Sequence, residues 1–390
     1  MNFPCTLLAA ALLAASATVS AADKVKVGFI STLSGPNGAI GVEIRDGWNL
    51  FLKLNGNKLG GLPAEVTIVD DQLNPDTGKQ LADRLVKRDR VDFLTGIVFS
   101  NVMLAAAPVA LEAKTFYISP NAGPSQFAGE GCNRMLFTVS WQNDQNNGAP
   151  GMLAQSRGYK SVYIVAPNYP AGRDALAGFK SYYKGKIVDE VYTKLGQLDY
   201  AAELAQIRAA KPEALFVFLP GGMGINFVKQ YVAAGLSKDI PLLVPGVSAD
   251  EDVLPAIGES MLGVTNTSHW AHDLDNPANR KFVPAFEAEF KRLPSLFAAQ
   301  GYDTAAMIDA AVRDVKGKIE DKEAVIRAMR AKRWQSVRGD FKWQNNNIPQ
   351  QNYYLRIVGK DAKGRITNKT VGVAAADLGD PYAAKCGNRW

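Results

Sequence analysis

Small polar residues and glycines gather where strand-like runs of this sequence end, and they suit the binding of an anionic or polar group. The ends read STLSGPNGA, GIVFSNV, ISPNAGP, VAPNYPAG, FLPGGMG and VPGVSAD. Hydroxyl and amide groups there donate hydrogen bonds, and glycine lets a ligand approach the backbone closely. Any single loop of this kind is also what an ordinary strand–helix turn requires, but six together favour a ligand cleft. The candidate donors are Ser100, Asn101, Asn121, Ser125 and Ser248, and the candidate points of close approach are Gly123, Gly221 and Gly222.

The sequence offers little for nucleotide binding or catalysis. GPNGA and PGGMG complete neither the P-loop pattern nor the dinucleotide-binding pattern. His269 and His272 are spaced to bind a metal ion, but no third ligand stands at helical spacing from them. GVSAD fails the nucleophile pattern G-x-S-x-G because its fifth residue is Asp250. We therefore expect a protein without enzymatic activity, cofactor or metal site.

Aromatic residues near the same strand ends are candidates for the wall of a cleft. Taken singly, most of them suit a hydrophobic core better than a ligand wall; they are Phe99, Phe127, Trp141, Trp270 and Tyr302. Tyr169 is the exception, because PNYPAG places it in a loop between two prolines and directly before a helix start.

The elements that must position these residues alternate between strands and helices. KVKVGFI, AEVTIVD, VDFLTGIV and TFYIS form a first series of strands, and a second series runs from LFTVS through SVYIVAP, KIVDEVYT, ALFVFLP and PLLVPG to GVTNTS. Such alternation predicts parallel sheets with helices on both faces, and the carboxyl ends of their strands form the usual ligand edge. Helices are expected near 276–292, 300–316 and 321–332, followed by a hairpin that turns at KDAKG.

The N-terminus is typical of a secretory signal peptide. The apolar run CTLLAAALLAASATVSAA ends in small residues, which predicts a signal over residues 1–22 with cleavage near Ala21-Ala22, although no Lys or Arg precedes the run. As a transmembrane helix the run would be short and interrupted by Ser and Thr. We expect a soluble exported protein, and its size favours two domains.

Cysteine content and charge indicate the compartment and the kinds of partner expected for the mature chain. Cys5 would leave with the signal, so Cys132 and Cys386 remain, and an oxidising compartment favours a disulfide between them over two free thiols. Lys and Arg together number 44 against 38 acidic residues, a net charge of +6 that is spread along the chain. Diffuse positive charge suits attraction of small anions, and we expect no nucleic-acid partner.

The motifs together resemble the exported solute-binding proteins of ABC importers, in the periplasmic-binding family typified by the leucine/isoleucine/valine-binding protein. The segments that carry the resemblance are VKVGFISTLSGPNGAIG, TGIVFSNV, ISPNAGPS, SWQNDQ, NYPAGRDALAGFK, AAGL and GYDTAAM, in family order from about Val25 to Val373. The resemblance implies two doubly wound parallel-sheet lobes, joined by three crossing strands, that close on a ligand. It places 24–143 with 270–342 in one lobe and 144–269 with 343–385 in the other.

The resemblance also assigns roles to residues. A ligand carboxylate would be held at Ser100-Asn101 and at the loop of Asn121, Ala122 and Gly123, with Tyr169 facing it from the other lobe. Gly221, Gly222, Val247 and Ser248 would complete the site. A bulky residue in place of Gly123 is expected to block the ligand while leaving the fold intact. The expected partners are a small carboxylate and an inner-membrane permease, for a monomeric protein in the periplasm.

Departures from the family bear on the ligand. Members that bind amino acids use an acidic side chain for the ligand ammonium, and Gly246, Val247 and Ser248 stand at the corresponding place. An aromatic wall residue is replaced by Ile40, and a second falls near Gly221, which predicts a roomier cavity. SWQNDQ resembles members that take up aromatic carboxylates, so an aromatic or other hydrophobic monocarboxylate is the expected ligand. Branched-chain amino acids, amides and urea-like solutes remain alternatives, with Asp250 or Glu251 as the ammonium partner, and an exported hydrolase is a further alternative.

Overall fold

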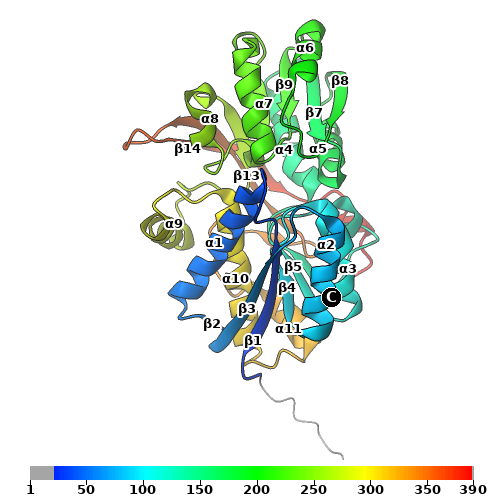
Figure 1. The fold of residues 1–390 in the computed structure, drawn as a ribbon, viewed down its shortest axis with the longest axis vertical. Coiled ribbons are helices and arrows are strands. Elements are labelled where there is room, and N and C mark those ends of the chain that lie inside the picture. The colour runs from blue at the N-terminus through cyan, green and yellow to red at the C-terminus, as the bar shows by residue number, and fades with distance from the viewer. Residues whose placement is uncertain (1–21, 389–390) are drawn as a thin grey trace, which may run out of the picture.

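The structure is a computed structural model that describes residues 22–388. Cys5 and nearly all of the predicted signal peptide therefore lie outside the described residues. Figure 1 shows two lobes stacked along the long axis, each built on its own sheet. This arrangement confirms the predicted fold class of two largely parallel sheets flanked by helices.

The first sheet contains the N-terminal strands in the order β2-β3-β1-β4-β5-β6. Their bounds are β1 Val25–Ser31, β2 Lys58–Leu59, β3 Leu62–Asp70, β4 Phe93–Thr95, β5 Phe116–Ser119 and β6 Leu136–Thr138. All neighbours are parallel except the short β2–β3 hairpin. The prediction that LFTVS begins the second series of strands is wrong. This segment forms β6, which pairs with β5 in the first sheet through an irregular connection rather than a crossover helix.

Within residues 22–388, six α-helices belong with the first sheet. They are α1 (Gly38–Leu54), α2 (Pro75–Asp83), α3 (Ser100–Glu112), α9 (Pro277–Phe290), α10 (Leu296–Asp314) and α11 (Lys322–Ala331). Helix α1 packs against α10, and α2 packs against α3, with strands between the two pairs (Figure 1). Local sequence sets the start of α2, because the side chain of Asn74 accepts hydrogen bonds from the N–H groups of Asp76 and Thr77 at 2.9 and 3.1 Å, and Pro75 follows it.

The second sheet has the order β12-β13-β11-β10-β9-β7-β8, with β14 paired to β13. Its strands are β7 Ser161–Pro167, β8 Lys186–Thr193, β9 Ala214–Val217, β10 Leu242–Pro245, β11 Thr265–Ser268, β12 Lys342–Trp343, β13 Pro349–Lys360 and β14 Ile366–Leu378. Strands β7 to β11 run parallel, and β13 and β14 form the predicted hairpin, with Lys360 opposite Ile366. The helices of this lobe are α4 Asn143–Ser156, α5 Pro170–Tyr182, α6 Ala201–Ala210, α7 Gly222–Ala233 and α8 Leu254–Ile257.

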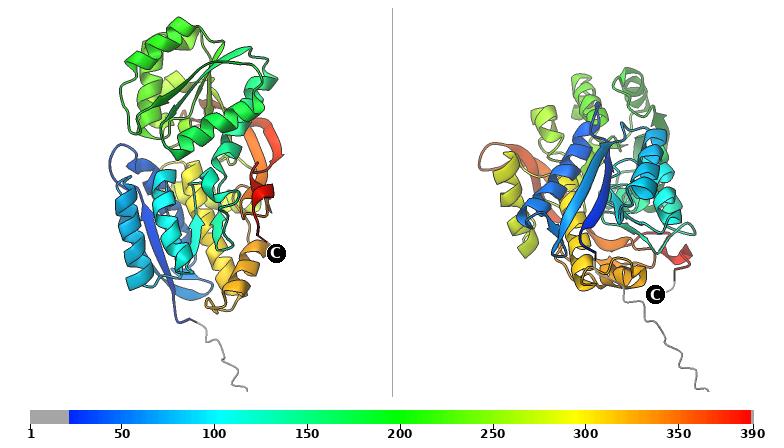
Figure 2. Two further views of the ribbon diagram at one scale, coloured as in Figure 1. Left: turned by 90° about the vertical axis from the view of Figure 1, so that its right-hand side faces the viewer. Right: turned by 60° about the horizontal axis from the view of Figure 1, so that its bottom comes forward.

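Within residues 22–388, the chain crosses between the two lobes after β6, after β11 and after α11 (Figure 2), and beyond β14 its C-terminal stretch returns to the first lobe, where Cys386 is bonded to Cys132. The lobes are thus joined by several short segments. The carboxyl ends of both sets of parallel strands face the space between the lobes. Within residues 22–388, no helix combines the length and the apolar character that crossing a bilayer requires.

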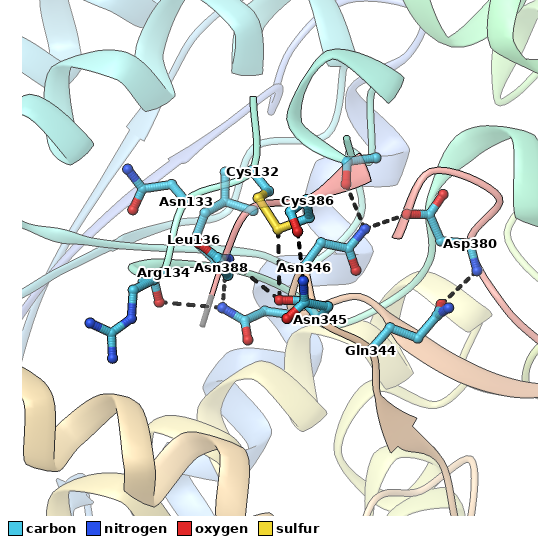
Figure 3. Close-up of a disulfide and its surroundings, with 12 residues drawn as sticks. Cys132, Asn133, Arg134, Leu136, Gln344, Asn345, Asn346, Asp380, Cys386 and Asn388 are labelled. Atoms are coloured by element: carbon cyan, nitrogen blue, oxygen red, sulfur yellow. Dashed lines mark hydrogen bonds between the residues drawn. A yellow bond between two sulfur atoms is a disulfide. The ribbon is translucent and has the colours of Figure 1, made fainter. Parts of the chain in front are cut away.

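The predicted disulfide joins Cys132 to Cys386 (Figure 3). The segment before β13 holds the same C-terminal stretch in place. Asn345 donates a hydrogen bond from Nδ2 to the Cys386 carbonyl at 2.7 Å, and Asn346 donates from Nδ2 to the Ala128 carbonyl at 2.7 Å and to the carboxylate of Asp380. The covalent bond therefore connects the end of the chain to the loop between β5 and β6.

Candidate functional site

Ser100 lies at the N-terminus of α3, just beyond the carboxyl end of β4. Phe99 precedes the helix in extended conformation, so Ser100 is the first helical residue, and its side chain is buried. The first N–H groups of a helix have no partner within the helix, and the helix dipole favours negative charge at this end. Ser100 thus brings a hydroxyl and a backbone donor to one point.

The loop after β5 supplies a second set of donors. Among residues 22–388, no acceptor takes a hydrogen bond from the N–H of Ala122 or of Gly123. The loop is held from behind, because the Gly123 carbonyl accepts from the Asn143 N–H at 2.8 Å and the Asn121 carbonyl accepts from Ser140 Oγ at 3.0 Å. The backbone amides of this loop are therefore fixed in place and free to bind an anion.

Gly123 also has a packing role that the sequence did not reveal. A Cβ atom at this position would lie 2.1 Å from the carbonyl oxygen of Trp141, which no side chain tolerates without a backbone shift. The expectation that a bulky residue at 123 leaves the fold intact is therefore wrong. Substitution here tests packing as well as binding.

Ser100 of the first group of donors, and Asn121 and Ala122 of the second, line a cavity between the lobes. Its volume is about 30 Å³. Residues of both lobes surround the cavity: Ile40, Val98, Phe99, Ser100, Asn121, Ala122, Trp141, Asn143, Tyr169, Ala171, Phe218, Pro220, Val247 and Phe297. Most of them follow the carboxyl ends of β4, β5, β7, β9 and β10, Trp141 and Asn143 follow β6, and Ile40 and Phe297 belong to α1 and α10. The cavity thus lies at the edge where parallel sheets bind ligands.

None of the residues that line this cavity carries a charge. Burial raises the pKa of Tyr169, so its phenol stays neutral and able to donate a hydrogen bond. The ring of Tyr169 lies against that of Phe99, with centroids 6.2 Å apart. A largely apolar cavity with neutral donors in its wall can hold a carboxylate by hydrogen bonds alone, and it offers no acidic partner to a ligand ammonium.

Five of the predicted site residues line the cavity, and the other five are not part of its lining. Ser100, Asn121, Ala122, Tyr169 and Val247 belong to the lining, whereas Asn101, Gly123, Gly221, Gly222 and Ser248 do not. Whether each of them contacts a ligand stays a prediction. Ser248 Oγ accepts a hydrogen bond from the Leu219 N–H at 3.0 Å, which is a structural role.

Gly221 and Gly222 serve the contact between lobes. Gly221 has a φ of +60° and approaches the side chains of Asn37 and Ile40, and a Cβ at Gly222 would lie 2.7 Å from the Pro36 carbonyl oxygen. Glycine at these two positions lets α7 begin directly against the loop that precedes α1.

Sequence reasoning missed six of the lining residues as site candidates: Val98, Asn143, Ala171, Phe218, Pro220 and Phe297. Four of them stand inside the strand-end segments already recognised, GIVFSNV, VAPNYPAG and FLPGGMG, so the signal was present. The expected roomier cavity is not found. Phe218, three residues before Gly221, supplies an aromatic wall from the second lobe.

The acidic candidates for a ligand ammonium are occupied elsewhere. Asp250 forms an ion pair with Arg356 at 2.8 Å and accepts a hydrogen bond from the Leu296 N–H, and both side chains of the pair are fully buried. Glu251 accepts hydrogen bonds from Thr367 Oγ1 and the Asn368 N–H, each at 2.9 Å. Neither Asp250 nor Glu251 lines the cavity.

The two histidines make separate contacts. The His269 ring packs edge-on against Trp141, with centroids 4.8 Å apart, and burial lowers its pKa well below the usual range. His272 Nε2 contacts Thr367 Oγ1 and the Asn368 carbonyl. Within the described part of the chain, no group of three or more His, Cys, Asp or Glu side chains is arranged to hold a metal ion.

A buried carboxyl at the start of α4 gives stability a pH dependence. Burial, with the nearby charge of Asp174, raises the pKa of Asp144 to about 7, although Gln142 Nε2 and the Tyr382 hydroxyl donate to it at 2.5 and 3.1 Å. The folded state thus binds this proton more tightly than the unfolded chain, whose value is near 3.8. The contribution of Asp144 to the free energy of unfolding is therefore fully present below pH 3.8 and is lost as the pH rises toward 7.

We expect Asp144→Asn to remove this loss. Relative to the parent, the variant should unfold at a higher temperature at pH 8, and this difference should be smaller at pH 5. At about 1.4 kcal/mol per pKa unit, the change in the free energy of unfolding is at most a few kcal/mol. Thermal unfolding followed by circular dichroism at both pH values measures it. A difference that does not vary with pH would contradict the assigned pKa.

Comparison with known proteins agrees with the two-lobed fold and the cavity between the lobes. A family model described as "Periplasmic binding protein" matches residues 24–363. The chain belongs to the periplasmic binding protein family. This confirms the family indicated by the sequence motifs, and it places the chain among the solute-binding proteins of ABC transport systems, not among enzymes.

Relatives of this periplasmic binding protein cover nearly its whole length. A Brucella melitensis protein named Leu/Ile/Val-binding protein homolog 6 is 31% identical over 375 residues, which cover 94% of this chain and 95% of that protein. A solute-binding protein of an ABC transporter from R. palustris, solved with benzoate, has a TM-score of 0.88 at 33% identity and covers 93% of this chain and 99% of its own. One from Rhodopseudomonas palustris BisB5, solved with 3,4-dihydroxybenzoic acid, has a TM-score of 0.86 at 33% identity and covers 92% and 99%.

Proposed function

We propose that this periplasmic binding protein captures an aromatic or other hydrophobic monocarboxylate in the cavity between its lobes and delivers it to the permease of an ABC importer. The observation that carries the proposal is the composition of the cavity wall. It combines neutral hydrogen-bond donors with apolar and aromatic side chains, and it contains no charged residue. The two structural relatives described above support it, since each was solved with an aromatic carboxylate.

In the proposed complex, the carboxylate lies at the N-terminus of α3. Ser100 and the N–H groups of Ala122 and Gly123 donate to it, and Tyr169 faces it from the second lobe. The ring or alkyl body packs among Ile40, Phe218 and Phe297, and the ligand leaves chemically unchanged. Hydrogen bonds to an ionised acceptor are stronger than those between neutral groups, which favours an acid over a neutral solute.

Lobe movement is part of the proposal. A space of about 30 Å³ accepts little more than an ordered water, so a ring enters when the lobes part and the walls withdraw. We take 24–143 with 270–342, and 144–269 with 343–385, as the two bodies, with the three crossings as hinges. The predicted signal peptide and monomeric state complete the proposal of a receptor that works in the periplasm.

A branched-chain amino acid is the second candidate, because the named sequence relatives are Leu/Ile/Val-binding protein homologues. Its ammonium group would enter a cavity whose lining holds no acidic side chain, which leaves a buried charge unpaired at a cost of several kcal/mol. This cost is the reason to prefer a monocarboxylate.

A thermal-shift panel tests the proposal. Benzoate, 4-hydroxybenzoate, cyclohexanecarboxylate, L-leucine and L-isoleucine are each added to protein that has been unfolded and refolded to remove bound solute. We expect the unfolding temperature to rise with the ring carboxylates and not with the amino acids. Stabilisation by leucine or isoleucine alone would contradict the proposed ligand class.

A further inference from the structure

Three buried side chains form a chain of hydrogen bonds behind the carboxylate end of the cavity. Asn143 Nδ2 donates to Ser100 Oγ at 3.2 Å and to Asp174 Oδ2 at 3.0 Å. Ser100 and Asn143 line the cavity, whereas Asp174 lies behind them on α5. The three residues are each more than nine-tenths buried.

The chemistry of these groups fixes which way each hydrogen points. A carboxylate only accepts, so the amide nitrogen of Asn143 and not its oxygen must face Asp174. The second hydrogen of the same nitrogen then points to Ser100 Oγ, which accepts it. Among residues 22–388, no acceptor takes the hydroxyl hydrogen of Ser100. That hydrogen is therefore left for a group inside the cavity.

Asp174 also joins the two lobes. It accepts from the Ser125 N–H at 3.0 Å and from Ser125 Oγ at 2.8 Å. Ser125 follows β5 of the first sheet, whereas α5 belongs to the second lobe. Burial raises the pKa of Asp174, and the donors Asn143 and Ser125 oppose that rise. The carboxylate of Asp174, in the second lobe, thus binds Ser125 of the first lobe directly and is linked through Asn143 to the ligand-facing Ser100 of that same lobe.

We propose that Asn143 and Asp174 are positioning residues that fix the Ser100 hydroxyl as a hydrogen-bond donor and thereby make the site prefer carboxylates to carboxamides. The inference rests on the proposed function in placing the head group of the ligand at Ser100. A carboxylate oxygen accepts the hydroxyl hydrogen, whereas the NH₂ of a carboxamide in that place faces a second donor. Because Asp174 bonds Ser125 in the same arrangement, closure of the lobes completes the relay.

The test compares two acid–amide pairs by calorimetry: benzoate with benzamide, and L-leucine with L-leucinamide. The parent should bind the acid of the accepted pair more tightly than its amide. In Asp174→Asn and in Asn143→Ala we expect this preference to fall about tenfold, which corresponds to about 1.4 kcal/mol. Two substitutions guard against a single variant that fails to fold, which circular dichroism would reveal.

Two control variants separate positioning from general loosening. Ser125→Ala removes only the hydroxyl contact between lobes, so it should weaken an acid and its amide equally and leave their ratio unchanged. Asp239→Asn changes an exposed acid of the second lobe and should alter neither affinity nor ratio. A ratio that falls as much in Ser125→Ala as in Asp174→Asn would overturn the positioning role.

The pairs also distinguish this inference from the proposed function. Preference for leucine over leucinamide, with no binding of benzoate, would support the relay and contradict the aromatic ligand. Equal binding of benzoate and benzamide would support the aromatic ligand and overturn the relay, and it would move the head group toward Asn121, whose Oδ1 has no partner in the described part of the chain. Binding of neither acid would contradict both.

Discussion

We expect the replacement of Arg356 with methionine to lower the free energy of unfolding by about 3–5 kcal/mol, because the buried carboxylate of Asp250 loses its cation. Neither side chain of this pair has any exposed surface. Arg356 Nε also donates to Asn266 Oδ1 at 2.8 Å, and Nη1 donates to the Trp270 carbonyl at 3.2 Å. The guanidinium thus connects β13 to β11, to Trp270 in the segment after β11, and to Asp250, which accepts from the Leu296 N–H at the start of α10.

Denaturant unfolding followed by tryptophan fluorescence measures this effect. The double variant Asp250→Asn, Arg356→Met should recover most of the loss, because no charge is then left buried alone. If the single variant is as stable as the parent, Asp250 is not held by Arg356. The reason for excluding Asp250 as an ammonium partner of the ligand would then fail.

We expect Ser100→Ala to weaken the binding of the proposed carboxylate ligand by about 10- to 150-fold, which corresponds to the 1.5–3 kcal/mol of a hydrogen bond to a charged group. The Ser100 hydroxyl lines the cavity and has its acceptor side occupied by Asn143. Removing it deletes one charge-assisted donor and leaves the backbone amides of α3 in place. The benzoate dissociation constant, measured by calorimetry, gives the change directly.

Ser248→Ala is the matched control for this prediction. Ser248 is equally buried and also follows a strand end, but its Oγ accepts from the Leu219 N–H and does not reach the lining. We expect affinity to stay within about twofold of the parent, with some loss of stability from the broken hydrogen bond. Equal losses of affinity at Ser100 and Ser248 would contradict the placement of the ligand at the α3 end.

The strand ends could be predicted from the sequence because local rules govern them. Alternation of strands and helices indicated parallel sheets, and small polar residues at strand ends marked Ser100 and Asn121 as site candidates. Tyr169 was marked by its loop position between two prolines. The assignment of LFTVS failed because strand pairing is a long-range property. Nothing within those five residues says that β6 lies beside β5 and not in the second sheet.

Asn143 escaped prediction for a related reason. The segment from Asn143 to Asn147 has the composition of a solvent-facing helix start, yet all five residues are buried. Their partners come from distant parts of the chain: Gln145 Nε2 donates to the carbonyls of Pro349 and Leu378, each at 2.7 Å. Burial of polar side chains depends on such partners, and a local pattern carries no information about them.

Calorimetric titration of the refolded, ligand-free protein with benzoate and with L-leucine tests the central claim most directly. If a neutral, donor-lined cavity binds a hydrophobic monocarboxylate, benzoate should bind at one site per chain and be recovered unchanged, and L-leucine should give no heat of binding. Tighter binding of L-leucine than of benzoate would contradict the account.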